Sequence, residues 1–385
     1  MTSSEITRDP DEDDVTPVEL FFDLVYVFAI GQLSHHLLQH PSWSGAAETA
    51  VLFVAVFGSW SYTTWTTSLL HPDRAPVRWM LLAVMVLGLF MNAAIGEAFG
   101  EAGWLFVATY LVSQLGRTAW ALRTGLEPVM RDHFRRVLVW VVATSPLWVA
   151  GAAASHGPRL ALWATAAVLD LVGTVTAHPL PGRRLESRGA TFAGSHLLER
   201  CRLFFLIALG ETVVTTGTAV VQAPLGLTTL VTGTVALVGT VAVWWLYFRR
   251  AENAALRGLD ESDDPARTGR YAIYSLMGMV AGLIAIAVGD QRVIADPGGR
   301  ADVATVLMLC GGPALFLLAQ GWYMHAAVGH LPRSRPVGVA ALVVAGALGL
   351  FLAPALAALV AVAVLIAIAV TDGRRAGTEE RSARA

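Results

Sequence analysis

Residues 355–370 read ALAALVAVAVLIAIAV, an unbroken run of sixteen Ala, Leu, Val and Ile side chains. The whole 385-residue chain has the same character, with 55% hydrophobic and only 15% charged residues and a mean hydropathy of +0.58. Soluble globular chains carry about 25% charged residues. The composition therefore excludes a soluble enzyme with one membrane anchor and predicts a chain embedded in a membrane over most of its length.

Twelve apolar runs follow one another along the sequence. Most can cross about 30 Å of hydrocarbon as a helix that rises 1.5 Å per residue. Backbone groups find no water in lipid, and the runs lack the period-two alternation of barrel strands, so helices are predicted. Pro354 separates the last two runs, for which we expect a tight helical hairpin. The predicted fold is an all-α, polytopic helix bundle with about 12 transmembrane helices at 19–38, 46–70, 79–99, 104–122, 134–154, 160–178, 196–221, 225–248, 271–289, 302–328, 337–352 and 355–370.

The distribution of arginine predicts the orientation of these runs. All 27 basic residues are Arg; 21 lie in the tails and alternate connections on one side, three on the other side and three inside runs. Positive residues concentrate on the cytoplasmic side of membrane proteins, so both termini are predicted to be cytoplasmic. The basic residues form no patch, and no nucleic-acid partner is expected. Cys201 and Cys310 lie in separate apolar runs, which excludes a disulfide framework, and no cofactor or metal spacing is present.

Four segments are expected along the chain. The acidic residues 1–18 are interpreted as a disordered tail, because a secretory signal would need a basic start. Residues 19–180 and 190–370 are interpreted as two six-helix halves, followed by a cytoplasmic tail at 371–385. Gly31-Gln32 and Gly210-Glu211 lie 179 residues apart in similar apolar contexts. This spacing is consistent with a parallel 6+6 repeat, an arrangement found in some transporters.

Charged residues near the start of the first run are the leading site candidates. Thr16-Pro17-Val18-Glu19 matches a capping box, so Glu19 either caps the helix or takes part in function. Asp23 lies one turn deeper and needs a partner, for which an arginine is the natural choice. Arg200 in the seventh run could supply it. The pair would be either a gating ion pair or a static bridge.

The seventh run carries further candidates. Glu211 shares a helical face with Arg200 but lies about 16 Å away along the axis, so the two cannot pair. Beside Gly210, where the small residue would allow close helix approach, we expect Glu211 to be a buried carboxylate that either carries a proton or is a neutral structural group. His196 and Glu199 stand one turn apart, which is weak metal-ligand spacing, and no metal is predicted.

The remaining candidates are polar residues in other runs. His35 and His36 near the end of the first run point about 100° apart, so an interfacial or internally bonded pair competes with a proton relay. Asp170, Gln114 and Glu97 are secondary candidates within the sixth, fourth and third runs. Arg117 is a further secondary candidate in the fourth run, and its alternative is to snorkel to the inner interface.

The stretch from Glu19 through Asp23 to Gln32 and His35 resembles the N-terminal signature of the bacterial low temperature requirement protein A (LtrA) family. Leu198-Glu199-Arg200, Leu209-Gly210-Glu211 and Trp244-Trp245-Leu246-Tyr247-Phe248 are similar to its second and third signatures. The resemblance implies a multi-pass protein of the bacterial cytoplasmic membrane. The family takes its name from a growth phenotype in the cold, and the name supplies no mechanism.

Three functions remain open at this stage. The first is a secondary transporter of a small solute, with or without coupling to protons; in the coupled form Glu211 carries the proton, and Asp23 with Arg200 forms a switching ion pair. The second is a non-transporting membrane protein that supports envelope or lipid behaviour during cold growth, in which the buried charges only hold helices in register. The third is an intramembrane lipid-acting enzyme, although the spacing contains no nucleophile–base pair and no enzyme is expected. Membrane lipids and an unidentified small solute are the expected partners.

Overall fold

The computed structural model describes residues 14–180, 194–260 and 265–384. Within these ranges the regular structure is helical and contains no β-strand, so the predicted all-α class is confirmed. Each of the twelve predicted runs coincides with a helical segment. The helices of the first part of the chain are α1 (Pro17–Gln39), α2 (Trp43–Thr67), α3 (Ala75–Ala93), the 3-10 turn η2 (Ile95–Glu97), α4 (Gly103–Ala121), α5 (Pro128–Ala153) and α6 (His156–Val175).

The second part of the chain is helical in the same way. Its elements are α7 (Gly194–Gln222), α8 (Leu227–Asp260), α9 (Pro265–Ala295), α10 (Val303–Val306), the π-helical turn η3 (Leu307–Gly311), α11 (Gly312–Val328), α12 (Ser334–Gly349) and α13 (Pro354–Arg384). The predicted hairpin after residue 350 is confirmed, because α12 and α13 are separate helices that pack on each other. The helix α13 continues to Arg384, through the stretch that was predicted as a tail.

Nine helices of the described residues are long and apolar enough to cross a membrane. The helices α2 and α4 are not among these nine, and α12 is apolar but has only 16 residues. The surface agrees with a lipid environment: large apolar side chains such as Val86, Phe90 and Val112 are half exposed, while Trp60, Trp148 and Trp163 are fully buried. The chain is therefore a multi-pass, membrane-type helical protein.

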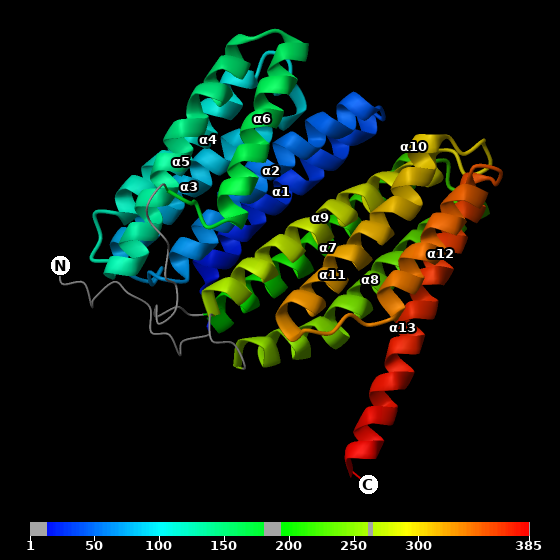
Figure 1. Cartoon of the computed structure of the whole chain (residues 1–385). Helices are drawn as coiled ribbons and strands as arrows, with labels where there is room; N and C mark the ends of the chain where they lie inside the picture. The colour runs from blue at the N-terminus through cyan, green and yellow to red at the C-terminus, as the bar shows by residue number, and fades with distance from the viewer. Residues whose placement is uncertain (1–13, 181–193, 261–264, 385) are drawn as a thin grey trace. The chain divides into compact units, whose positions relative to one another are not determined.

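The described residues fall into two compact units. The first comprises α1 to α6 together with the start of α7 through Phe204 and the start of α9 through Arg270. Within it, α1 packs against α2 and α3, and α3 to α6 pack in chain order (Figure 1). Close packing is visible at Gly151 of α5, where an added Cβ would collide with the Trp163 indole of α6.

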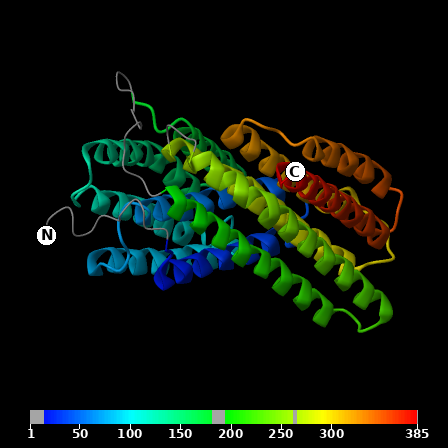
Figure 2. The same ribbon diagram turned by 90° about the horizontal axis from the view of Figure 1, so that it is seen from below.

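The second unit contains the remainder of α7 and α9, α8 and α10 to α13. Here α8 packs against α11 and α13, and α12 also packs against both α11 and α13. Figure 2 shows α12 and α13, drawn in orange and red, lying side by side. At Gly282 of α9, an added Cβ would lie 2.8 Å from the Gly312 carbonyl oxygen of α11, so the two backbones approach closely there.

Candidate functional site

The first turn of α1 begins with the predicted capping box. The Thr16 backbone N–H and the Thr16 hydroxyl both donate to Glu19 Oε2 at 3.0 Å. Pro17 occupies the first helical position, where its missing N–H costs no hydrogen bond. The Glu19 side chain is nevertheless fully buried, which a simple surface cap would not require.

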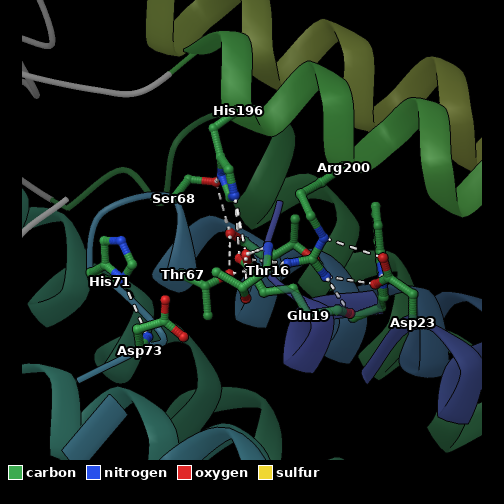
Figure 3. Close-up of polar contacts among 11 residues, drawn as sticks. Thr16, Glu19, Asp23, Thr67, Ser68, His71, Asp73, His196 and Arg200 are labelled. Atoms are coloured by element: carbon green, nitrogen blue, oxygen red, sulfur yellow. Dashed lines mark hydrogen bonds and ion pairs between the residues drawn. The ribbon is translucent and has the colours of Figure 1, made fainter. Parts of the chain in front are cut away.

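Arg200 of α7 joins both acidic residues of α1. Its Nη1 donates to Glu19 Oε1 at 2.8 Å, and its Nη2 donates to Asp23 Oδ1 at 2.6 Å. The Nε also donates to Asp23 Oδ2 at 3.2 Å, so the Asp23 contact is bidentate. All three side chains have 0% exposure, and Figure 3 shows them pointing toward one another. The predicted Asp23–Arg200 pair is thus present in the structure.

Helix α2 completes this cluster with neutral donors and acceptors. The Trp60 indole N–H donates to Asp23 Oδ1 at 2.8 Å, and its ring packs 4.2 Å from the Phe204 ring. Arg200 Nη1 lies 3.3 Å from Thr67 Oγ1, and Nη2 lies 3.5 Å from Thr64 Oγ1. We call Glu19, Asp23, Arg200, His196 and these α2 residues the Arg200 cluster. Sequence analysis missed the α2 residues, although the run Thr63-Thr64-Trp65-Thr66-Thr67-Ser68 is an unusually hydroxyl-rich end for a membrane helix.

His196 is the second ionisable group that α7 brings to the cluster. Its Nε2 lies 3.3 Å from the Glu19 carboxylate, and its Nδ1 lies 3.1 Å from Ser68 Oγ, with no exposure of the side chain (Figure 3). Two carboxylates and one guanidinium leave one excess negative charge when His196 is neutral. A protonated His196 would bring the formal charge of these four side chains to zero.

The cluster lies at one end of the first unit. Glu19 is in the first turn of α1, Thr67 ends α2, and His196 is in the first turn of α7. The arginine distribution predicts that this end is cytoplasmic. The buried charges therefore close the end of the helices rather than occupy the middle of the bundle.

Glu211 and Glu199, the other acidic candidates of α7, lie outside the cluster. Glu211 belongs to the second unit and is half-buried, so it is less buried than expected. An added Cβ at Gly210 would meet nothing within 4 Å, so no helix of the described residues uses the close approach that this glycine allows. Glu199 forms a partly exposed ion pair with Arg202 at 3.2 Å.

The histidines at the end of α1 take different partners. His35 is exposed and its Nε2 lies 2.8 Å from Gln39 Nε2. The buried His36 lies 3.2 Å from Glu48, whose other oxygen is 3.1 Å from His156. This is the internally bonded arrangement considered from the sequence. In the described part of the chain, no group of three His, Cys, Asp or Glu residues has the arrangement of a metal site.

Arg117 of α4 does not snorkel, so the structure excludes this alternative for it. Its side chain is only 2% exposed; Nη2 donates to Gln114 Oε1 at 2.6 Å, and Nη1 donates to Thr63 Oγ1 at 3.0 Å. Its Nε has no hydrogen-bond partner, and no carboxylate of the described residues lies within ion-pair distance. The interior of the first unit therefore contains a cation that is held only by neutral groups.

Asp170 of α6 forms the remaining interior centre. Its carboxylate accepts from the Thr144 hydroxyl at 2.7 Å, the Trp148 indole at 3.0 Å and the Tyr110 hydroxyl at 3.1 Å. These three donors satisfy the oxygens of a carboxyl group in a partly buried site. Glu97, in contrast, lies exposed in η2 between α3 and α4 and not inside the third membrane run. Sequence analysis missed Tyr110 and Trp148 because neither carries a charge.

The comparisons with known proteins agree with the residue patterns of α1, α7 and α8. Residues 14–370 match the family described as bacterial low temperature requirement A protein (LtrA). An uncharacterized protein of Rhizobium meliloti (strain 1021) is 34% identical over 332 residues, which cover 84% of this chain and 80% of that protein. No solved structure matches. Because the match extends over nearly the whole sequence, the chain belongs to the LtrA family.

Proposed function

We propose that this LtrA-family protein is a secondary transporter of a small solute in the bacterial cytoplasmic membrane. The observation that carries the proposal is Arg117, a guanidinium with 2% exposure and no carboxylate of the described residues at ion-pair distance. A buried guanidinium that is held only by neutral groups costs free energy relative to a paired one, and a role in function would explain why this cost is tolerated. Ionisable residues inside membrane bundles mark solute and ion pathways.

The polar interior between the Arg200 cluster and Arg117 supports this proposal. One turn beyond Asp23 in α1, the Tyr26 hydroxyl lies 2.9 Å from Ser59 Oγ of α2. Arg117 also approaches α2, through Thr63 and the ring of Tyr62, whose centroid is 5.4 Å from the guanidinium carbon. A series of polar side chains thus extends from the end of the first unit into its interior.

In this proposal the Arg200 cluster is a closed gate. Separation of α7 from α1 would break both carboxylate contacts of Arg200 together. The gate would therefore have two discrete states, closed with both contacts formed and open with both broken. The charges would then be hydrated rather than left in the apolar interior. His196 offers a proton site at the gate, and Glu211, whose carboxylate makes no hydrogen bond or ion pair with the described residues, remains the proposed proton-coupling group in the second unit.

The proposed topology has twelve spans, a parallel 6+6 repeat and both termini in the cytoplasm. It adds α2, α4 and α12 to the nine apolar helices. The 25 residues of α2 and the 19 residues of α4 are long enough to cross, and their polar side chains face inward at Ser59, Thr63 and Gln114. The split of the arginines supports the alternation of sides.

A specific observation also favours the second candidate, a non-transporting membrane protein that supports the envelope in the cold. The charged groups of the Arg200 cluster have protein partners at 2.6 to 3.3 Å and no exposure, as expected for a static clamp between helices. Buried ion pairs can fix helix register without any other role.

Native cysteine labelling separates these two candidates. Cys201 is adjacent to Arg200 and 4% exposed, and both cysteines of the chain are free and buried. In a Cys310→Ser background that is otherwise unchanged, a gate predicts that N-ethylmaleimide labels Cys201 of the folded protein slowly, whereas a static clamp predicts labelling only with global unfolding. Asp23→Asn should speed the labelling in either case and shows that Cys201 reports on the cluster. Glu199→Gln serves as the matched control and should label as the wild type. Labelling of the otherwise unchanged protein only with global unfolding would contradict the gate.

Transport itself is tested by proton flux in proteoliposomes that contain a trapped pH dye. A panel of small organic-acid anions, inorganic phosphate and neutral sugars is added with and without a pH gradient. A solute that produces a flux with the wild-type protein should produce none with Arg117→Gln. The pH dependence of this flux should change in Glu211→Gln, and Arg202→Gln should transport the solute as the wild type does. The proposal fails if no solute gives a flux above protein-free liposomes, or if Arg117→Gln leaves every flux unchanged.

A further inference from the structure

Asp290 is a buried acidic residue of α9 in the second unit that belongs to none of the clusters described above. It is 7% exposed, and its Oδ2 is enclosed without a hydrogen-bond partner. Neither carboxyl oxygen makes a hydrogen bond or an ion pair with the described residues. Sequence analysis did not select Asp290, because it directly follows the predicted run 271–289, whereas α9 continues to Ala295.

The surroundings of Asp290 on its own helix are apolar. Among the nine apolar helices of the described residues, α9 has the largest buried share. Ile286, one turn before Asp290, is 8% exposed, and Ile294, one turn after it, is 1% exposed. At Gly289 an added Cβ would lie 3.2 Å from the Leu309 backbone nitrogen, so α9 and η3 pack closely at this level. The carboxyl group therefore lies in an apolar, tightly packed part of the second unit.

The element that packs against Gly289 is irregular. Leu307–Gly311 form the π-helical turn η3, and α11 begins directly after it at Gly312. An added Cβ at Gly312 would lie 3.0 Å from the Ile286 backbone nitrogen, and α9 and α11 lie side by side (Figure 1). Turns of this kind are rare and frequently occur at functional sites. An irregular backbone segment and an acid without a partner thus meet at one level of the unit.

The charged groups closest to Asp290 in this part of the chain are paired with each other. Arg292 Nη2 donates to Asp302 Oδ2 at 2.7 Å, and Arg292 Nε donates to Thr305 Oγ1 at 2.7 Å. Within α10 and η3, the remaining titratable side chain is the buried thiol of Cys310. An ionised Asp290 would therefore have no cation beside it in the part of the chain that the structure describes. Burial of an unpaired carboxylate costs far more free energy than burial of the neutral acid.

We infer that Asp290 is a proton-binding site, whose carboxyl group holds a proton in the folded protein at neutral pH. It releases this proton only when water or a cation reaches this level of α9. Asp290 lies about 8 Å along the helix axis from the end of α9 at Ala295. The arginine distribution predicts that this end faces the outside of the membrane, so proton exchange is expected from that side. The assignment does not depend on transport, and the function proposed above gives Asp290 no part.

Stability as a function of pH tests this assignment in the full-length, detergent-purified protein. The unfolded chain releases the Asp290 proton above about pH 4, whereas the folded protein keeps it. Asn resembles the neutral acid at every pH, so Asp290→Asn should become more stable than the wild type as the pH rises from about 4 to about 7. The other titratable groups are the same in both proteins, and their contributions cancel in the difference between the melting temperatures.

Asp302→Asn is the matched control for this measurement, because it removes an ion-paired carboxylate near the same end of α9. It should not become more stable than the wild type as the pH rises. The same pH dependence in the wild type and Asp290→Asn would overturn the assignment. A stability advantage of the wild type that grows with pH would also overturn it.

Dicyclohexylcarbodiimide locates the proton directly. This apolar reagent takes up the proton of a neutral carboxyl group, bonds to its oxygen and rearranges to a stable N-acylurea, with no leaving group. Trypsin cleavage after Arg270 and Arg292 releases a peptide in which Asp290 is the only carboxyl side chain. Mass spectrometry should detect the modified peptide at neutral pH, and its rate of formation should fall about tenfold per pH unit once the carboxyl ionises.

The variants and sodium ions define the outcomes of the labelling. Asp290→Asn should remove the modification of peptide 271–292, and Asp302→Asn should leave it unchanged. No modification at any pH, or a modification that survives Asp290→Asn, would overturn the assignment. Protection by sodium chloride but not by choline chloride at constant pH would show that the site binds a metal cation, and this result would overturn the proton assignment.

Discussion

Arg200 binds the Asp23 carboxylate through two nitrogens, with Nη2 2.6 Å from Oδ1 and Nε 3.2 Å from Oδ2, across a sequence separation of 177 residues. The bidentate geometry fixes both the distance and the rotation of the guanidinium. Because neither side chain is exposed, each charge depends on the other for compensation. The start of α7 is thereby tied to the first turns of α1 within one unit.

Replacement of Arg200 by Met should strongly destabilise the protein. The change leaves the Glu19 and Asp23 carboxylates buried without their cation, at a cost of about 3–5 kcal/mol. The free energy of unfolding in detergent micelles measures the effect. Arg202→Met removes a partly exposed ion pair two residues away and should change stability by less than about 0.5 kcal/mol. Equal effects of the two substitutions would contradict the importance of the buried pair.

A cycle of substitutions tests whether the cluster acts as one unit. The triple variant Glu19→Gln, Asp23→Asn, Arg200→Met removes all three charges together, so no uncompensated ion remains buried. We expect it to be more stable than Arg200→Met alone, although its parts taken singly are each destabilising. Additive free energies in the unfolding measurements would show that the three residues do not interact.

Trp60→Phe tests the neutral donor that α2 provides. The ring can still pack against Phe204, but the 2.8 Å hydrogen bond to Asp23 is lost. Loss of a hydrogen bond to a buried charged group should cost about 1.5–3 kcal/mol in thermal unfolding. Trp43→Phe changes an indole that is 80% exposed and should be nearly neutral. A neutral Trp60→Phe would mean that Asp23 is satisfied without this donor.

Gly151→Ala tests the close packing of α5 against α6. The added Cβ would collide with the Trp163 ring, whose indole N–H is held by the Trp148 carbonyl at 2.9 Å. Because this ring is fixed, the collision should cost about 1–3 kcal/mol. At Gly116 an added Cβ meets nothing within 4 Å, so Gly116→Ala should leave the melting temperature unchanged or slightly raised. A lower melting temperature for Gly116→Ala than for Gly151→Ala would refute this packing.

Stability should depend on pH through Asp302, which caps α10 outside the membrane-spanning segments. Partial burial favours the neutral acid, but hydrogen bonds from Thr305 and the Arg292 guanidinium outweigh it and hold the pKa of Asp302 below its usual 3.8. An acid with a lowered folded-state pKa stabilises the protein above the unfolded-state pKa, and this stabilisation disappears as the pH falls through the folded-state pKa.

The destabilisation caused by Asp302→Asn should therefore be constant from about pH 8 to 5 and shrink below about pH 4. Melting temperatures of the two proteins across this pH range measure the difference. A difference between wild type and Asp302→Asn that grows at low pH would contradict the sign of this linkage.

Part of the site could be predicted because local rules apply to it. The capping box is a four-residue pattern, and it places Glu19 in the first turn of α1. Asp23 and Arg200 could be paired from the sequence since a charge in an apolar run needs an opposite charge. The α2 partners could not be assigned in this way, because a hydroxyl or an indole gives no comparable sign of what it faces.

Glu211 and Arg117 show the limit of the same reasoning. Both lie in apolar runs, yet the Glu211 side chain is half-buried and the Arg117 side chain is 98% buried within the described residues. The snorkelling alternative for Arg117 considered only its distance from the end of its own helix. Its actual environment depends on which face of α4 meets Thr63 of α2, and that is a property of the packing.

The sequence alone determined that this chain is an all-helical membrane protein, since the cost of unpaired backbone groups in lipid leaves long apolar runs no other structure. It also determined that Asp23 must find a cation. Only the tertiary structure decided that Arg200 binds two carboxylates and that α2 supplies the remaining hydrogen bonds. It also decided that the Arg117 side chain is buried with no carboxylate of the described residues at ion-pair distance. Helix formation is set by interactions within one segment, whereas these contacts depend on the rotation and depth of several helices at once.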